Sequence, residues 1–178
     1  MLMERKKLLG EERRTKLLHL LQTSAEPVTG SELSQITNVS RQVIVGDITL
    51  LKARNEPIIA TSQGYLYLQT GSTQKPERII ACQHDPSRTQ EELYLLVDIG
   101  ITVKDVKIEH PVYGDLTASI MVSSRKEVQQ FLSRVTATNA SFLSELTSGI
   151  HLHTLSAASE DLLDEAECAL RDAGILVD

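Results

Sequence analysis

Hydrophobic residues in the first part of the chain recur every three or four positions, the spacing of one face of a helix. Four leucines within Gly10–Gln22 predict a first amphipathic helix. Thr29 and Glu32 have the spacing of a capping box, so we expect a short second helix to begin there. Ser40 is a suitable N-cap for a third helix over Arg41–Arg54. One face of this helix carries four residues, most of them apolar: Val43, Asp47, Ile48 and Leu51.

From Ile58 to Leu68 the pattern changes to alternation on both sides of a turn, which predicts a β-hairpin. Three helices followed by a hairpin form the winged helix-turn-helix arrangement, whose third helix can enter the major groove of DNA. Arginine pairs with guanine and glutamine with adenine, and the N-terminal end of the third helix offers both side chains. The predicted DNA contacts are Ser40, Arg41, Gln42, Val45, Thr49 and Lys52.

The same elements also build small domains that bind other proteins, so the pattern alone leaves this second interpretation open. Gly46 is unexpected inside the third helix, because glycine there costs about 1 kcal/mol relative to alanine. Either the helix is a weak one, or a neighbouring backbone or a groove comes close at this position. We favour the interpretation that Gly46 is a small residue because it faces the edge of a DNA base.

The polar segment Gln69–Pro76 is the best candidate for a linker, and beyond it strands and helices alternate in the order βαββαβα. This order predicts an α+β fold, a two-layer open-faced sandwich with a mainly antiparallel sheet. We therefore expect two domains, 1–70 and 76–178. The predicted strands are 78–84, 106–112, 116–122 and 150–155, with 175–177 as a candidate final strand. Three helices are predicted. The first begins with a capping box at Ser87–Gln90, the second begins at Ser124, and the third covers 159–173.

Histidines suggest a metal site in the second domain. His151 and His153 are two positions apart in a predicted strand, so both side chains point to the same face. If the strand that ends at His84 lies alongside, His84 and Glu92 converge on them. Three imidazoles and one carboxylate suit zinc, nickel, iron or manganese. Spacing alone leaves Glu91 as an alternative ligand, and it also allows two solvated or hydrogen-bonded histidines without a metal.

A His-Pro pair at a predicted strand end, His110-Pro111, is followed by a glycine turn. Such a site can line a pocket for a small molecule, with His110 and Tyr113 as candidate contacts. The alternative is a half-exposed histidine at the edge of the sheet. The sequence has no spaced nucleophile and base, no phosphate-binding glycine loop and no HExxH motif, so we do not expect an enzyme.

Composition and charge narrow the class of protein. The 178 residues are 41% hydrophobic and 24% charged, as in a globular protein. No apolar run approaches the roughly 18–20 residues of a membrane span, and the N-terminus lacks a secretory pattern. Two distant cysteines outside any CxxC pair fit reduced thiols, so we expect a cytoplasmic protein. Residues 1–70 carry a net charge of +2 (9 Lys+Arg, 7 Asp+Glu) and residues 71–178 one of −8 (9 and 17), which indicates modules with different partners.

Three histidine motifs give the second domain a specific resemblance to a known family. They are Cys-Gln-His84-Asp, Glu-His110-Pro-Val-Tyr-Gly-Asp and Gly-Ile-His151-Leu-His153-Thr. In this order they resemble the three-histidine (3H) domain, and the segment 29–54 resembles the winged helices of many bacterial regulators. Together they resemble the niacin-responsive transcriptional repressors of Gram-positive bacteria, over about residues 8–175.

The resemblance implies a homodimeric repressor of genes for NAD synthesis or niacin uptake, with nicotinic acid as co-repressor. It implies a regulatory domain similar to phosphocarrier proteins, with a metal on His84, Glu92, His151 and His153. Two rivals remain. One is a winged-helix repressor that responds to another effector or to the metal itself. The other is a metalloenzyme with a DNA-binding module, for which Asp85 and Asp115 are the nearby candidates for a general base.

Overall fold

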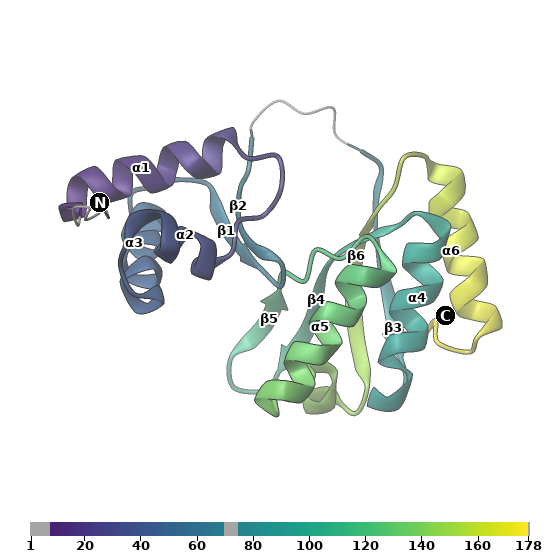
Figure 1. Cartoon of the computed structure of the whole chain (residues 1–178). Coiled ribbons are helices and arrows are strands. Elements are labelled where there is room, and N and C mark those ends of the chain that lie inside the picture. Colours follow the sequence, from purple (N-terminus) through teal and green to yellow (C-terminus); the bar gives the residue numbers. More distant parts are fainter. Residues whose placement is uncertain (1–7, 70–74, 178) are drawn as a thin grey trace. The chain divides into compact units, whose positions relative to one another are not determined.

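The structure, a computed structural model, describes residues 8–69 and 75–177. The chain forms two compact units that divide between residues 72 and 73 (Figure 1). This division falls inside the predicted linker 69–76, whose central residues 70–74 lie outside the described part. Among the described residues, no helix combines the length and the apolar character that a membrane crossing requires.

The N-terminal unit contains three helices and a hairpin, as the pattern predicted. They are α1 (Gly10–Thr23), α2 (Gly30–Thr37), α3 (Arg41–Ala53), β1 (Ile58–Thr61) and β2 (Gly64–Tyr67). Both halves of the predicted capping box are present, because the Thr29 side chain accepts from the Glu32 amide and the Glu32 carboxylate accepts from the Thr29 amide. The Ser40 hydroxyl accepts from the Val43 amide and begins α3. Local hydrogen bonds therefore set the first residues of both helices.

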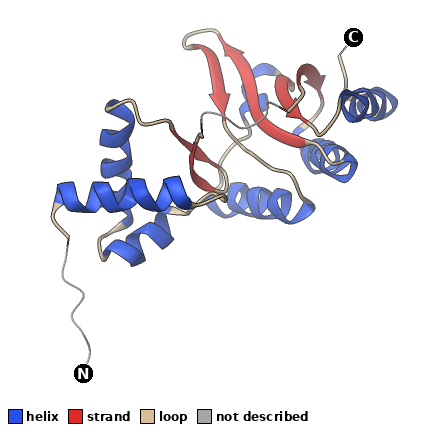
Figure 2. Ribbon diagram, turned by 90° about the horizontal axis from the view of Figure 1, so that it is seen from above, coloured by secondary structure: helices blue, strands red, loops and turns tan. Residues whose placement is uncertain are grey.

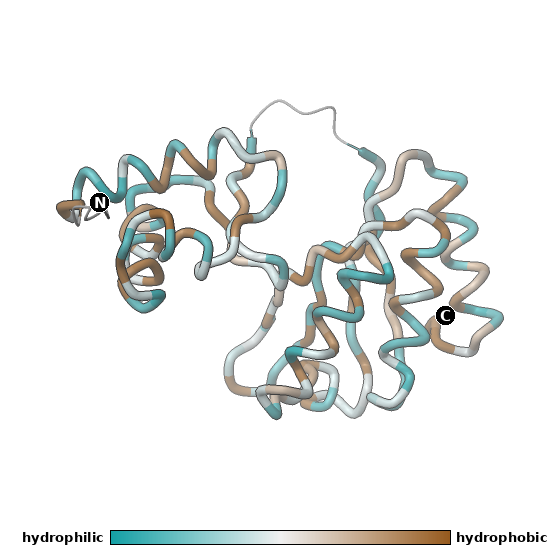
Figure 3. The backbone as a smooth tube through the Cα atoms, viewed as in Figure 1, coloured by the Kyte–Doolittle hydropathy of each residue, from teal (hydrophilic) through white to brown (hydrophobic). Residues whose placement is uncertain are grey.

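The core of this unit lies between the helices and the hairpin. Figure 3 shows hydrophobic and hydrophilic residues alternating along α1, and its hydrophobic side is buried. Val28 pairs with Tyr65 and adds a third short segment to the hairpin. Gly64 has φ +135°, and a Cβ there would lie 2.6 Å from the Val28 carbonyl oxygen, so only glycine fits this pairing. The buried apolar side chains are Leu17, Leu21, Leu33, Ile44, Ile48, Leu51 and Ile58.

The C-terminal unit has four strands and three helices, with two short 3₁₀ turns. The strands are β3 (Glu77–Gln83), β4 (Thr102–His110), β5 (Gly114–Ala118) and β6 (Ile150–Ser156). The helices are α4 (Thr89–Ile99), α5 (Arg125–Thr138) and α6 (Glu160–Asp172). The 3₁₀ turns are η1 (Pro86–Arg88) and η2 (Leu143–Thr147).

The sheet has the order β3-β6-β4-β5, and every pair of neighbours is antiparallel. Figures 1 and 2 show α4, α5 and α6 on one face of this sheet. The fold is therefore the predicted α+β sandwich with an antiparallel sheet. Because β6 is central, its helix-side residues face the space between the two layers. This placement brings His151 and His153 beneath the helices.

The limits of several elements differ from the predictions. Strand β5 covers Gly114–Ala118 rather than 116–122. The capping box at Ser87 does not form, because Asp85 caps the turn η1 by accepting from the Ser87 amide and α4 starts at Thr89 without a side-chain cap. Strand β4 starts at Thr102, four residues before the predicted Val106, and its register against β6 shifts between Val103 and Asp105. Within the described part of the C-terminal segment, a single isolated bridge joins Leu176 to Cys82 of β3.

Candidate functional site

The structure brings the four predicted metal ligands together on the helix side of the sheet. His84 follows β3, Glu92 lies in the first turn of α4, and His151 and His153 lie on β6. Strands β3 and β6 pair so that Cys82 is opposite His151, and this register places His84 beside the two histidines. All four side chains are buried, and Glu92 is only 1% exposed. A buried carboxylate among buried imidazoles requires a specific chemical reason.

The carboxylate of Glu92 is the point on which the three rings converge. His84 Nε2 lies 2.8 Å from Oε2 of Glu92, and His151 Nε2 lies 3.3 Å from Oε1. His153 Nε2 lies 3.4 Å from Oε2. Ligand atoms around one tetrahedral ion, each at about 2.1 Å from it, are about 3.4 Å apart. The observed separations of 2.8–3.4 Å are therefore in the range for atoms that share one ion.

The other nitrogen of each ring is held by the backbone. Nδ1 of His84 donates to the Asp85 carbonyl at 2.8 Å, and Nδ1 of His151 donates to the Gly149 carbonyl at 2.8 Å. Nδ1 of His153 donates to the Asp105 carbonyl at 2.6 Å. A carbonyl can only accept, so all three Nδ1 atoms carry the proton. A ring that carries no second proton therefore turns its Nε2 lone pair toward Glu92, the arrangement that backbone partners impose on metal-binding histidines.

This arrangement fits a cation. Lone pairs of neutral imidazoles that face a carboxylate repel it, and a proton or a metal ion between them removes the repulsion. Among the described residues, His153 Nε2 has no hydrogen-bond partner although it is buried, because its contact with Glu92 lacks hydrogen-bond geometry. A divalent transition metal supplies the missing partner for all four groups at once.

The electrostatics of the cluster agree with its need for positive charge. Burial alone lowers the pKa of His84 and His153, but the adjacent Glu92 carboxylate outweighs it and raises both. Burial alone raises the pKa of Glu92, but the charge of His153 and the close contacts with the three histidine rings hold it well below its usual value. Glu92 is therefore an anion that its surroundings must neutralise.

The structure separates Glu92 from its neighbour Glu91. Glu91 is exposed and pairs with Arg88 at 2.8 Å, so it faces away from the cluster.

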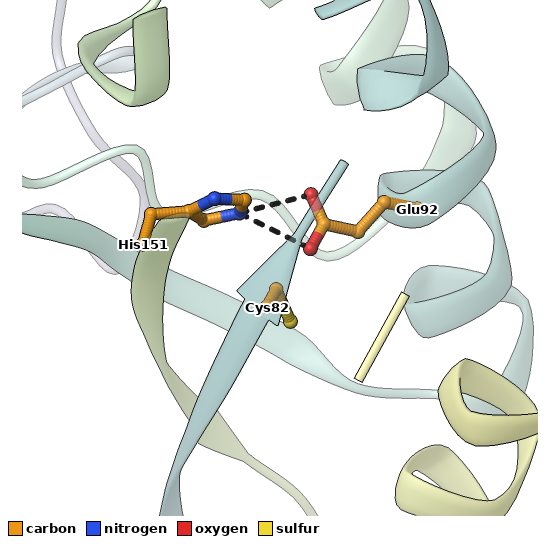
Figure 4. A group of neighbouring side chains, drawn as sticks. All are labelled: Cys82, Glu92 and His151. Carbon is orange, nitrogen blue, oxygen red and sulfur yellow. Dashed lines mark hydrogen bonds and ion pairs between the residues drawn. The ribbon is translucent and has the colours of Figure 1, made fainter. Parts of the chain in front are cut away.

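Cys82 is a neighbour of the cluster that the sequence analysis did not identify. Its thiol lies within 4.8 Å of ligand atoms of Glu92 and His151 (Figure 4). Burial, together with the charge of Glu92, raises the pKa of this thiol far above its usual range, so the sulfur stays protonated unless a metal displaces the proton.

A cavity of about 230 Å³ adjoins the cluster. His84, Glu92, His151 and His153 form one part of its wall. The rest comes from the sheet, α4, α5 and the segment 140–144 that follows α5, and it is mostly apolar. The apolar side chains are Leu93, Val106, Ala118, Ile120, Phe131, Val135, Ala140, Phe142 and Leu143. A small ligand in this cavity would contact the histidines at one end and hydrocarbon at the other.

His110 and Tyr113, the predicted effector contacts, lie at the turn between β4 and β5 and do not line this cavity. Their rings are 5.0 Å apart, and the Val112 and Tyr113 amides donate to Nδ1 of His110. Tyr113 is 75% exposed. The structure therefore brings these two residues together but keeps them apart from the histidine cluster.

All six predicted DNA contacts are exposed, at the start of α3 and along its outer side. Gly46 lies on the same side, and a Cβ there would meet nothing within 4 Å. The opposite side of α3 is buried, and Asp47 on it is bound by Arg13 of α1 with an Nε–Oδ2 distance of 2.5 Å. Sequence reasoning put Asp47 on the inner face but missed Arg13 as its partner, because charged residues cluster throughout the first turns of α1.

Comparison with known proteins matches both units to families. Residues 77–178 match the 3H domain and residues 13–66 match an HTH domain. The chain is 60% identical over 176 residues to "Transcription repressor NadR" of Bacillus subtilis (strain 168), covering 98% of each protein. It is 36% identical over 172 residues to "Probable transcription repressor NiaR" of Thermotoga maritima, covering 97% of each.

Proposed function

Because the chain belongs to the family of 3H-domain transcription repressors that includes NadR and NiaR, we propose that it represses genes of NAD synthesis or niacin uptake. In this proposal nicotinic acid is the co-repressor and the working form is a cytoplasmic homodimer. The observation that carries it is the presence, in one chain, of an exposed helix-turn-helix face and a buried His₃Glu cluster beside a small cavity.

The DNA-binding part of the proposal rests on α3. Its N-terminal residues Ser40, Arg41 and Gln42 are exposed, and in this proposal they reach base edges in the major groove. Val45, Thr49 and Lys52 continue the same side of the helix, with Lys52 available for a phosphate. A homodimer would present two such helices, which fits an operator with two equivalent half-sites about one DNA turn apart.

The regulatory part rests on the cluster. His84, Glu92, His151 and His153 would hold one divalent ion, with nickel, zinc, iron and manganese as candidates. Such an ion supplies a positive charge and a coordination position that an anionic carboxylate can occupy. The backbone carbonyls of Asp85, Gly149 and Asp105 orient the three rings by binding their Nδ1 atoms.

Repression by nicotinic acid requires a difference in its affinity for two arrangements of the dimer. If the liganded form holds the recognition helices at operator spacing, the ligand raises DNA affinity by its differential binding energy, typically 1–3 kcal/mol. His110 and Tyr113 stay predicted effector contacts, and their position at the β4–β5 turn makes this prediction separable from binding in the cavity.

A second candidate function is a repressor that responds to the metal itself or to a different effector. The buried His₃Glu cluster is the observation that favours a metal sensor. A chelator would then abolish DNA binding whether or not nicotinic acid is present.

We infer that the protein is a regulator without catalytic activity. Of the two candidate bases, Asp85 is engaged in capping η1, and Asp115 is on β5 opposite Glu109.

The direct test is selection of DNA fragments from the source genome by the metal-loaded protein, with and without nicotinic acid. The proposal predicts that fragments upstream of genes for niacin uptake or NAD synthesis are enriched only with nicotinic acid, and that nicotinamide is inactive. Enrichment that is independent of nicotinic acid but lost with chelator would support the metal sensor instead. An Arg41→Ala, Gln42→Ala variant should recover no fragment, and sequence-specific recovery by it would contradict the role of α3.

A further inference from the structure

Cys82 brings a fifth donor atom to the histidine cluster. It lies on β3 opposite His151 of β6, and its side chain is 0% exposed. Its sulfur, the Glu92 carboxylate and the His151 ring have ligand atoms that all lie within 4.8 Å of one another (Figure 4). Two ligand atoms on opposite sides of one ion, each about 2.1–2.3 Å from it, are about 4.4 Å apart. Shifts of a few tenths of an ångström would therefore let all three groups share an ion.

The backbone holds Cys82 in place from both sides. Strand β6 pairs with it on one side, and an isolated bridge joins it to Leu176 on the other. The amide of the next residue, Gln83, donates to the Ile175 carbonyl at 2.9 Å. A donor atom on a backbone that is fixed in this way needs little rearrangement to meet an ion.

A buried cysteine often serves only as a small apolar residue, and Cys82 does contact the hydrophobic core of its unit. Its sulfur, however, also lies beside a carboxylate and an imidazole. A second observation points to a ligand among these groups. Nε2 of His153 is buried and has no hydrogen-bond partner among the described residues, although it faces Oε2 of Glu92 at 3.4 Å. The demand for a cation is thus independent of the cysteine.

Charge balance favours sulfur as a ligand. Three neutral imidazoles and the Glu92 carboxylate carry one negative charge, so a divalent ion leaves one positive charge uncompensated in a buried cluster. A thiolate from Cys82 brings the sum to zero, and a neutral group is the least costly to bury. Cys82 does not line the adjoining cavity, whereas the four predicted ligands do, so its sulfur approaches the cluster from another side.

We propose that Cys82 is a fifth ligand of the metal, and that its thiolate increases the preference of the centre for zinc over manganese. The proposal rests on the metal centre of the proposed function and adds a residue to it. As the metal–sulfur bond forms, the S–H bond of the thiol breaks and its proton leaves to the solvent. Thiolate is a soft ligand that zinc accepts, whereas manganese prefers oxygen ligands.

Cobalt(II) is the probe, because a thiolate bound to it gives an intense near-ultraviolet charge-transfer band that nitrogen and oxygen ligands do not give. The chain has two cysteines, and the second, Cys168, is exposed on α6. In the Cys168→Ala variant, sulfur from a thiol can therefore come only from Cys82. Metal-free full-length protein is loaded with one equivalent of cobalt(II). We expect the band in wild type and in Cys168→Ala, and its loss in Cys82→Ser, which keeps the visible bands of cobalt held by the histidines.

The second measurement is the ratio of zinc affinity to manganese affinity, determined by competition with a chelator. We expect Cys82→Ser to lower this ratio about tenfold or more, since even outer partners of metal ligands are worth 10–100-fold. A substitution that merely loosens the packing would lower both affinities together and leave the ratio unchanged. Cys168→Ala is the matched control and should keep the wild-type ratio. Melting temperatures are measured for all three proteins.

Cobalt bound to Cys168→Ala without the charge-transfer band would overturn the assignment and leave the histidines and Glu92 as the whole ligand set. The same band in Cys82→Ser would also overturn it, because the sulfur would then come from Cys168. An unchanged ratio of zinc to manganese affinity in Cys82→Ser would contradict the role in selectivity. A wild type that binds no cobalt would contradict the metal centre itself, and the assignment of Cys82 would fall with it.

Discussion

At the residue scale, the cluster depends on one negative charge among three imidazoles. Glu92 is buried and faces Nε2 of all three histidines, whereas Glu91 pairs with Arg88 at the surface. We expect Glu92→Gln to lower metal affinity by about 100-fold or more, since even outer partners of metal ligands are worth 10–100-fold. Competition with a chromogenic chelator measures this. Glu91→Gln is the matched control and should bind as wild type does. Equal affinity in both variants would contradict the ligand set.

A buried ion pair in the other unit gives a prediction about stability. Asp47 of α3 accepts from Arg13 of α1, and both side chains are buried. Asp47→Ala leaves the Arg13 charge buried and unpaired, so we expect the free energy of unfolding of the N-terminal unit to fall by about 3–5 kcal/mol. Urea denaturation followed by circular dichroism measures the change. Glu11→Ala, which removes surface pairs with Arg54 and Arg14 and leaves the Arg13–Asp47 pair in place, should have a much smaller effect. A similarly small effect of Asp47→Ala would show that the Arg13 guanidinium becomes hydrated in the variant and is not left buried and unpaired.

The residue types at the site were predictable to different degrees. Alternation in a strand directs His151 and His153 to one face whatever the surrounding fold. In the structure both side chains lie on the same face of β6 and are buried. Glu91 and Glu92 are adjacent on a helix, and only the packing of α4 on the sheet distinguishes them. Cys82 was missed although it begins the Cys-Gln-His84-Asp motif. Its closeness to Glu92 and His151 arises from packing between residues that are distant in sequence.

At the element scale, α3 carries a prediction in which stability and DNA binding change in opposite directions. Gly46 is exposed inside the helix, and a Cβ there meets nothing within 4 Å. Gly46→Ala should therefore raise the free energy of unfolding by about 1 kcal/mol. If this side of α3 enters the major groove closely, the added methyl group should weaken operator binding. Denaturation and operator titration of the same variant test both parts. Increased stability with unchanged operator affinity would mean that Gly46 is not at the DNA interface.

The loop before β6 is adapted to the cluster at Gly149. This residue has φ +88°, and a Cβ would lie 2.3 Å from the carbonyl oxygen of His84. Its own carbonyl orients His151. Gly149→Ala should therefore displace His84 and lower metal affinity. Gly100→Ala is the matched control, because Gly100 has φ +97° with nothing within 4 Å. It should cost about 1–2 kcal/mol of stability through backbone strain and keep the metal affinity. Equal metal affinity in the two variants would contradict the account.

Element types were easier to predict than element limits. The capping box at Thr29 and the N-cap at Ser40 depend on residues three positions apart, so the sequence contains the whole interaction. The start of α4 was wrong because Asp85, not Ser87, accepts the capping hydrogen bond. The start of β4 was wrong because its first residues pair with β6 beyond a register shift, which alternation cannot reveal.

At the scale of the whole molecule, the charge difference between the two halves corresponds to two units with different tasks. The N-terminal unit, with a net charge of +2 over residues 1–70, carries the exposed helix-turn-helix face. The acidic C-terminal unit carries the cluster and the cavity. In the proposed function, effector binding to the C-terminal unit changes the DNA affinity of the N-terminal unit, and by linkage DNA raises the affinity for the effector by the same factor.

The measurement that tests this account most directly is the operator affinity of the metal-loaded full chain, titrated by fluorescence anisotropy with and without saturating nicotinic acid. A coupling of 1–3 kcal/mol corresponds to an increase in affinity of about 5- to 150-fold, and nicotinamide should give none. The salt concentration must be the same in all titrations, since phosphate contacts make the affinity depend on it. Equal operator affinity with and without nicotinic acid, in protein shown to retain its metal, would contradict the central claim.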